Sequence, residues 1–291
     1  MNNFLLLVSG FLFSSEFIFT KLFEKYKGST YKETVNFVFL TGLIMFLLLF
    51  AVNGFKIEFS LVSVLYAFLL ALLNVIANIV SIKAVPIGSL VVLTLFMMSG
   101  GTVVPFMVGI FFLNEQINLA SALALFLLMF ALFLPLFKKK DKAENKINTL
   151  FIILCILTFA LNGANATVGK LHQINPNSVD TIDMLTIKYM FRTIFGLLML
   201  FTVTSKNQVK DLFEKKSIGC SAGYAIVHAV ATVLQLFCAV TENATLIYPL
   251  ITGGTLIFTP LLTLIIFKEK LDKCTIWQIV VSVVATTLFV I

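Results

Sequence analysis

Two short segments indicate how this chain is built: Ser99-Gly100-Gly101-Thr102 and Thr252-Gly253-Gly254-Thr255, whose glycine pairs lie 153 residues apart. Each segment is embedded in a long apolar run, and each is followed by a proline, Pro105 in the first run and Pro260 in the second. Small residues let membrane helices approach closely, and Gly-rich stretches at corresponding places in two halves point to a transporter's binding site. The repeated motif therefore predicts a membrane protein made of two related halves.

The composition of the whole chain also indicates a location in the membrane. Hydrophobic residues make up 59% of the 291 positions, charged residues only 12%, and the mean hydropathy is +1.04. Because a soluble domain has about 25% charged residues and is only about half apolar, this chain has too little polar surface to face water. The net charge of +7 comes from lysines in short connections, which favours an anionic lipid surface over nucleic acid as a partner. The four cysteines are isolated and indicate neither a metal site nor a disulfide framework.

Ten apolar runs have the length of a membrane-spanning helix, for which about 20 mostly apolar residues are needed. They cover residues 3–20, 34–53, 60–82, 88–112, 119–137, 148–169, 184–204, 218–238, 244–267 and 274–291. The expected fold class is an all-α polytopic membrane protein with ten transmembrane helices and no soluble domain.

Lysines are unevenly distributed over the connections between these runs. Seventeen of them follow odd-numbered runs, whereas only Lys56 and Lys170 follow even-numbered ones. Because basic residues are enriched in cytoplasmic loops, this bias predicts that the odd-numbered connections are cytoplasmic and that both termini lie outside.

Polar features occur in the same order in both halves of the chain. Glu16 matches Asn165 at an offset of 149 residues, and Asn74 matches His228 at an offset of 154. Together with the Gly-Gly pairs and the acidic turns that follow them, four features recur in order, which indicates a duplication.

The charged segment 138–147 separates the two copies, which are residues 1–137 and residues 148–291. Each copy contains five helices, and because five is odd, the second copy is expected to cross the membrane in the opposite sense. Inverted repeats of this kind are found in transporters, which hold their substrate near the midplane between the repeats.

In each copy the fourth helix ends in a similar turn, Phe112-Leu113-Asn114-Glu115-Gln116-Ile117 and Phe267-Lys268-Glu269-Lys270-Leu271. With ten helices in two such copies, the whole chain resembles the EamA-type members of the drug/metabolite transporter superfamily. That resemblance implies a carrier of small molecules with cytoplasmic termini, which is opposite to the topology that the lysines predict.

The first helix is also similar to helix one of the small multidrug resistance proteins, because Ser15, a small residue, precedes Glu16. This similarity implies that Glu16 is a shared site for protons and cations. The chain differs from those proteins in lacking a tryptophan-rich first helix. It also has Thr41 near the place of their arginine, whereas Arg192 takes the matching place in the second copy.

Glu16 is the strongest candidate for a functional residue. An acidic residue at the centre of a membrane helix costs about 2.5–3.5 kcal/mol, so Glu16 is expected to face a polar interior or to be protonated. Ser9 and Thr20 share its helix face. Glu16 is interpreted as a proton-exchanging carboxyl, and the alternative is a structural hydrogen bond to a neighbouring helix.

Further polar residues form stripes on three other helices and are candidates to line a substrate cavity. They are Asn74, Asn78 and Ser81; Thr158, Asn162 and Asn165; and His228, Thr232 and Gln235. Amide and hydroxyl groups also bond between packed membrane helices without binding a ligand, and both interpretations stay open. His228 could relay protons, although a histidine satisfied between helices is the favoured interpretation.

Two basic residues inside the seventh run, Lys188 and Arg192, share a helix face. They are expected to snorkel to the membrane surface, and the alternative is that they attract an anionic substrate or pair with Glu16. Glu115 is expected to cap the turn into the fifth helix, and His172 is expected in a loop.

The function predicted from these features is secondary active transport of a small metabolite, such as an amino acid or amine, by alternating access. Coupling to protons is expected through Glu16, for which substrate and proton would compete, with Asn74, Asn78, Asn162, Asn165, His228, Gln235 and Arg192 binding substrate. The sequence has no phosphate-binding Gly-x-x-x-x-Gly-Lys-Ser/Thr loop, and no cofactor or metal is expected. A channel or sensor is the alternative, and an intramembrane enzyme is less favoured. Twenty lysines against one arginine suggest an AT-rich bacterial genome, and hence a bacterial cell membrane, with a monomer or homodimer as the assembly.

Overall fold

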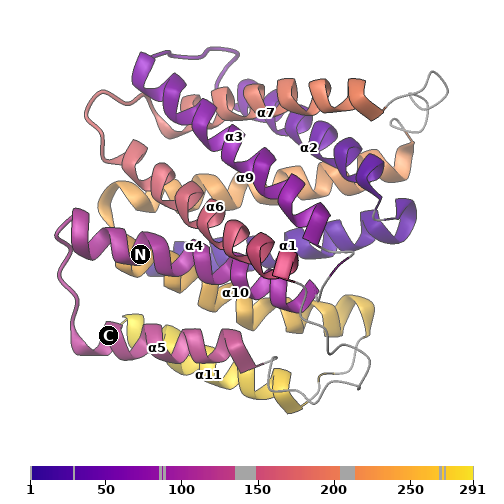
Figure 1. Ribbon diagram of the computed structural model, residues 1–291. Helices are drawn as coiled ribbons and strands as arrows, with labels where there is room; N and C mark the ends of the chain where they lie inside the picture. The colour runs from indigo at the N-terminus through magenta and orange to yellow at the C-terminus, as the bar shows by residue number, and fades with distance from the viewer. Residues whose placement is uncertain are drawn as a thin grey trace.

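The computed structural model describes residues 2–28, 30–84, 87, 90–134, 149–203, 214–268, 271 and 273–290, and this part of the chain is helical apart from short connections. Ten helices follow one another along the described residues (Figure 1). They are α1 (Asn2–Lys27), α2 (Tyr31–Val52), α3 (Leu61–Ala84), α4 (Leu90–Phe112), α5 (Leu119–Phe133), α6 (Thr149–Gln173), α7 (Thr181–Val203), α9 (Lys215–Thr241), α10 (Ala244–Phe267) and α11 (Lys273–Val290).

Nine of these described helices are long and apolar enough to cross a membrane, and α5 is a shorter apolar helix of 15 residues. The predicted fold class, an all-α polytopic membrane protein, is confirmed. The charged segment 138–147 and the end of the fifth apolar run lie outside the described residues.

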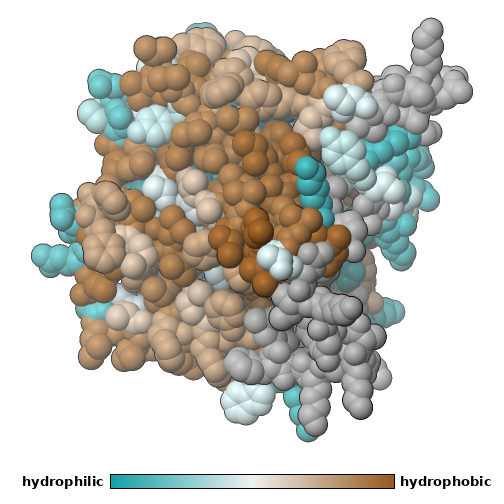
Figure 2. Space-filling view, viewed as in Figure 1, coloured by the Kyte–Doolittle hydropathy of each residue, from teal (hydrophilic) through white to brown (hydrophobic). Residues whose placement is uncertain are grey.

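The outer surface of the bundle is apolar, as contact with lipid requires. Figure 2 shows hydrophobic side chains over most of the visible face of the helices. Large side chains such as Phe111, Phe126 and Trp277 are exposed on this protein. An apolar surface of this extent marks contact with a membrane or a partner, and the helix lengths indicate the membrane.

Local sequence signals set several of the helix ends. The Thr30 side chain accepts a hydrogen bond from the Glu33 N–H at the start of α2, and Asn118 accepts one from the Ser121 N–H over 2.7 Å at the start of α5. At the other end of its helix, Lys268 terminates α10 in the left-handed conformation, with φ of 56°.

Three pairs of matching helices from the two copies pack against each other and run antiparallel. Where α2 contacts α7, Val35 packs on Leu200, while Asn53, just beyond the other end of α2, donates to Asp183 Oδ1 over 2.6 Å. The contacts of α4 with α10 and of α5 with α11 are antiparallel as well. If the copies had the same sense, matching helices would be parallel. The two copies are therefore inverted relative to each other.

Most of the helix packing joins one copy to the other. Helix α1 packs on α9 and α10, and its counterpart α6 packs on α3 and α4. The counterparts of α9 and α10 are α3 and α4. Exchanging each helix for its counterpart therefore converts the first pair of contacts into the second, as a twofold axis between the copies requires. The boundaries at residues 137 and 148 thus separate sequence repeats, and the hydrophobic core combines residues from both.

The Gly-Gly motifs lie where these helices cross most closely. A Cβ on Gly100 would overlap the carbonyl oxygen of Phe159 in α6, and a Cβ on Gly10 in α1 would lie 2.9 Å from the carbonyl oxygen of Ile251 and 3.2 Å from Cα of Gly254 in α10. Only glycine permits such contact between backbones. The motifs therefore have a packing role at two matching helix crossings.

Helix α6 continues beyond its apolar run, and this corrects the placement of two residues. Lys170 and His172 lie inside α6, not in a connection, and both are buried. Lys170 Nζ donates to the carbonyl oxygens of Ala239 and Glu242 at the end of α9, while His172 Nε2 lies 2.9 Å from Ser63 Oγ. The run predicted from hydropathy ends too early because hydropathy counts both residues as polar. It does not show that groups on neighbouring helices satisfy their hydrogen bonds.

Glu115 caps a helix, but not the one expected from the sequence. Its carboxylate oxygens accept hydrogen bonds from the backbone N–H groups of Ala244 and Thr245, over 2.8 and 2.9 Å, at the start of α10. A carboxylate is favourable there because the first N–H groups of a helix are unpaired and carry partial positive charge. Residue 269, its counterpart, lies outside the described part of the chain.

Candidate functional site

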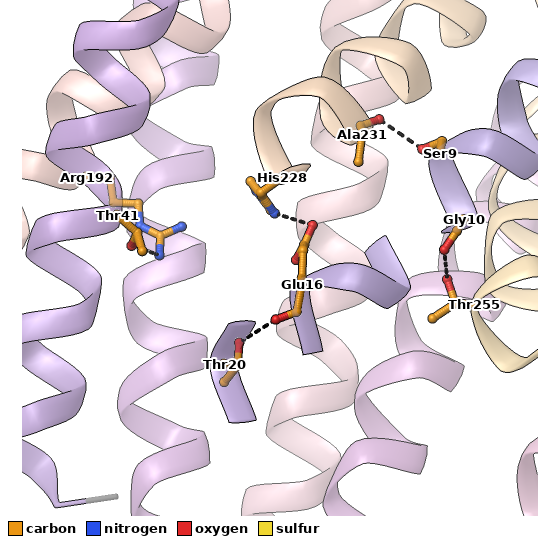
Figure 3. A network of polar contacts seen from close by, with 9 residues as sticks. All are labelled: Ser9, Gly10, Glu16, Thr20, Thr41, Arg192, His228, Ala231 and Thr255. Carbon is orange, nitrogen blue, oxygen red and sulfur yellow. Dashed lines mark hydrogen bonds and ion pairs between the residues drawn. The ribbon is translucent and has the colours of Figure 1, made fainter. Parts of the chain in front are cut away.

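Glu16 faces a histidine from the other copy of the repeat. Helices α1 and α9 pack antiparallel along their length, and Glu16 Oε1 lies 2.7 Å from Nδ1 of His228 (Figure 3). Each of these two side chains is only 13% exposed. Glu16 therefore faces the protein interior, as expected from the free-energy cost of placing an acidic side chain in lipid. Its role in proton coupling stays a prediction.

His228 is surrounded by aromatic rings. The ring of Tyr224 stacks on it at 5.4 Å with an interplanar angle of 12°, and Phe13 and Tyr189 make edge contacts. Its second ring nitrogen, Nε2, is buried and has no hydrogen-bond partner among the described residues. His228 is thus bonded between two helices through one of its two ring nitrogens, and whether it relays protons stays open.

The polar neighbours of Glu16 on α1 serve the helix contacts. Ser9 Oγ donates to the carbonyl oxygen of Ala231 on α9 over 2.9 Å, and Thr20 Oγ1 donates to the carbonyl oxygen of Glu16 itself (Figure 3). Ser9 therefore fixes α1 against α9. This contact helps to set the position from which the Glu16 carboxylate reaches His228.

Lys188 and Arg192 do not snorkel to the membrane surface. They are only 5% and 3% exposed, because α7 is packed against α2, α3 and α9. Arg192 Nη2 donates to Thr41 Oγ1 over 3.2 Å, while its Nε–H is buried without a partner among the described residues. The expectation of snorkelling is wrong because neighbouring helices enclose the face that these residues share.

Five side chains from α1, α7 and α9 form one group, called the central cluster below. They are Glu16, Lys188, Arg192, Tyr224 and His228. Lys188 interacts electrostatically with both Arg192 and Glu16, and the Tyr224 hydroxyl approaches the Glu16 carboxylate. With His228 neutral, the formal charges of one carboxylate and two cations leave the cluster at +1.

The predicted amide residues are not joined to this cluster by hydrogen bonds in the described structure. Asn78 donates to Asn74 over 3.3 Å, and Asn162 donates to the carbonyl oxygen of Thr158 over 3.1 Å. The Oδ1 atom of Asn165 is buried without a partner among the described residues. These four residues lie on α3 and α6, whose contact is the counterpart of the contact between α1 and α9.

The two inverted sites consequently differ in chemistry. Glu16 and His228 are paired in one site, and their counterparts Asn165 and Asn74 place amides in the other. Gln235 is half-buried on α9, where no hydrogen bond to the described residues is found. A role for these amides in binding substrate stays a prediction.

Three side chains of this region were not predicted from the sequence: Tyr224, which belongs to the cluster, and Thr41 and Tyr189, which contact it. In the sequence, Thr41 stands out only because it lies near the place of the arginine in the small multidrug resistance proteins. Tyr189 is next to Lys188 and Tyr224 is four residues before His228, and this spacing was the available signal in the sequence. Spacing alone could not select these two among the six tyrosines of the chain.

A separate polar pocket of about 470 Å³ opens at the end of the bundle where both termini lie (Figure 1). Its lining includes the amides of Asn2, Asn3, Gln116 and Asn118, together with Glu242. None of the central cluster residues lines it. Within the described residues, no group of three or more His, Cys, Asp or Glu side chains could hold a metal ion.

Comparison with solved structures supports the fold. One structure, described only as "Crystal structure of protein", superposes with a TM-score of 0.71 over 99% of this chain and 95% of its own, at 8% sequence identity. No protein-family model and no curated protein sequence matches the chain. At this identity the similarity concerns the fold alone.

Proposed function

We propose that this protein is a secondary active transporter of a small metabolite that works by alternating access, coupled to protons through Glu16. The observation that carries this proposal is the pairing of Glu16 with His228, 2.7 Å apart, at an interface between two inverted copies. We further propose that it is an EamA-type member of the drug/metabolite transporter superfamily in a bacterial cell membrane.

The inverted copies support alternating access. Because their helices are related by a twofold axis, a conformation open on one side has a counterpart open on the other. Most of the helix packing crosses between the copies, so a rearrangement of one against the other changes access to the residues at their interface. The central cluster lies at that interface.

The buried acid–base pair supports proton coupling. A carboxyl and an imidazole in contact can share or pass on a proton, and imidazole changes its charge near neutral pH when unperturbed. A buried carboxylate without a partner is costly, so a change in the protonation of Glu16 alters which arrangement of α1 and α9 is favoured. Proton binding and helix packing are therefore linked.

Substrate-driven proton movement into sealed vesicles tests the proposal. Purified protein is reconstituted into proteoliposomes that contain a pH indicator, and amines, amino acids and organic acids are added one class at a time. A transporter gives a saturable pH change with at least one class, and Glu16→Gln abolishes it. The matched control is Glu58→Gln, which makes the same change at an exposed position between α2 and α3.

The proposal fails if Glu16→Gln transports as the wild type does. It also fails if ion flux rises without saturation, because that behaviour is characteristic of a channel.

A further inference from the structure

We infer that the substrate carries a carboxylate, which binds between Arg192 and Lys188 while Glu16 serves as the internal counter-ion of these cations. This inference deepens the proposed function, because it names the chemical class of the transported molecule. It depends on the charges and unpaired donors of the central cluster.

The first observation is a buried guanidinium that lacks an anionic partner. Arg192 is 97% buried, its Nη2 has only the neutral hydroxyl of Thr41 as acceptor, and its Nε–H has no acceptor among the described residues. Burying a charge without a paired counter-charge is costly. A site with this cost at the centre of a carrier favours an anionic ligand.

The second observation is that Glu16 does not neutralise these cations by direct contact. Its Oε1 atom is paired with His228, and in the described part of the chain neither Lys188 nor Arg192 lies within ion-pair distance of a carboxylate. Glu16 acts on Lys188 only through electrostatic attraction. The two cationic groups are thus available to an incoming anion.

Charge matching favours an anion over an organic cation. With Glu16 ionised and His228 neutral the cluster has a formal charge of +1, so a monoanion brings it to zero. An organic cation would raise it to +2, which is unfavourable in a low-dielectric interior. A guanidinium also offers paired N–H donors that match the two oxygens of a carboxylate.

The cluster is enclosed, which limits the size of the ligand. Lys188 and Arg192 are at most 5% exposed, and Glu16 and His228 have 13% exposed side chains. A lipid headgroup or a peptide cannot reach these groups within the helix bundle. A small molecule can reach them when the copies of the repeat move apart.

The same charges reverse the expected sign of proton coupling. An organic cation would compete with protons for Glu16, whereas protonation of Glu16 removes a negative charge beside a bound carboxylate. Proton and anion therefore assist each other's binding, which is reciprocal by linkage, and the expected mode is cotransport.

The charged and titratable groups that face Glu16 are consistent with this mode. On the helices packed around it they are Tyr224 and His228 of α9 and Lys188, Tyr189 and Arg192 of α7. Helix α2 presents the neutral Thr41, and α10 contains no Asp, Glu, Lys, Arg or His. No second carboxylate is therefore available among these groups to take the place of the substrate.

Acetate, a small carboxylate probe, tests the assignment in a thermal unfolding assay. Purified protein is titrated with sodium acetate or ethylammonium chloride at a constant ionic strength set with sodium chloride. We expect acetate to raise the Tm by about 2–4 °C, as binding to the folded state does for a chain of this size, and ethylammonium to leave it unchanged. Arg192→Gln removes the acetate shift, Arg192→Lys retains part of it, and the control Lys56→Gln, at an exposed loop position, retains all of it.

Ethylammonium stabilisation of the wild type without acetate stabilisation overturns the assignment, and this comparison does not need the variants to fold. Equal shifts by acetate in the wild type and in Arg192→Gln overturn it as well. An unchanged Tm of the wild type as acetate replaces chloride overturns the choice of a carboxylate.

The vesicle assay separates this inference from the proposed function. Saturable, Glu16-dependent transport of amines with no transport of organic acids overturns the carboxylate assignment and leaves the transporter intact. Acetate binding that depends on Arg192, with no saturable transport of any class, supports the assignment and contradicts the transporter.

Discussion

Arg192 Nη2 donates to Thr41 Oγ1 over 3.2 Å, and these two residues are 151 positions apart, at matching places in the two copies of the repeat. Counterparts touch only close to the axis that relates the copies. The contact therefore places the only arginine of this chain near the centre of the protein, beside the other charges of the central cluster.

Replacing Thr41 by valine removes the hydroxyl acceptor that Arg192 uses and leaves a buried guanidinium N–H unpaired. A buried donor that loses its partner costs about 1–3 kcal/mol, so we expect Thr41→Val to lower the unfolding free energy by that amount. Chemical unfolding in detergent, followed by circular dichroism, measures the difference. Thr202→Val is the matched control, since Thr202 is exposed and bonds only within α7. Equal stability of the two variants would contradict the role of the hydroxyl.

Glu16 and His228 are expected to be coupled energetically. Residues in direct contact show interaction energies of about 0.5–3 kcal/mol in double-mutant cycles, so Glu16→Gln and His228→Gln together should cost less than the sum of the two single changes. The cycle is measured by unfolding free energies at neutral pH. A second cycle that combines Glu58→Gln with His228→Gln should be additive, because Glu58 is exposed in the connection between α2 and α3. Additive costs in the first cycle would show that the pair makes no net contribution.

The adjacent glycines of the first Gly-Gly motif should respond in opposite ways to alanine. A Cβ at position 100 would overlap the backbone of Phe159, whereas a Cβ at position 101 would meet nothing within 4 Å. Overpacking costs about 1–3 kcal/mol or more, while alanine gains about 1 kcal/mol over glycine within a helix. We expect Gly100→Ala to lower the Tm and Gly101→Ala to leave it unchanged or raise it. A reversed order would contradict the close crossing of α4 and α6.

Glu115→Gln weakens the cap of α10, because a neutral amide interacts less favourably with the helix N-terminus than a carboxylate. Helix caps and charge–dipole contacts are each worth about 1 kcal/mol. The expected result is faster hydrogen exchange of the Ala244 and Thr245 amides, with little change at the start of α5. Asn118→Ala, which removes the cap of α5, should produce the opposite pattern. Faster exchange in α5 after Glu115→Gln would restore the interpretation drawn from the sequence.

The helices and the inverted repeat follow from the sequence because both depend on local or periodic properties. The length of each apolar run is set by the thickness of the bilayer, and the bounds of α10 agree with its predicted run at both ends, Ala244 and Phe267. Polar residues at helix ends were harder to place. Lys170 and His172 read as parts of a connection because hydropathy does not reveal that neighbouring helices satisfy them.

The candidate site was predicted only in part, for a related reason. Glu16, His228 and Arg192 stand out in the sequence because a charged or titratable group in hydrocarbon needs an explanation. Their partners could not be read from it, since Glu16 contacts a residue 212 positions away and Arg192 one that is 151 positions away. The aromatic residues around His228 had no distinguishing signal of their own.

Composition and the spacing of repeated motifs are enough to predict a bundle of membrane helices in two related copies, because contact with lipid and duplication both produce patterns along the chain. Which side chains contact each other, in contrast, depends on how the helices pack. The inverted packing sets Glu16 against His228 and gives Arg192 a neutral partner, and this division of charge depends on contacts between helices that are distant in the sequence.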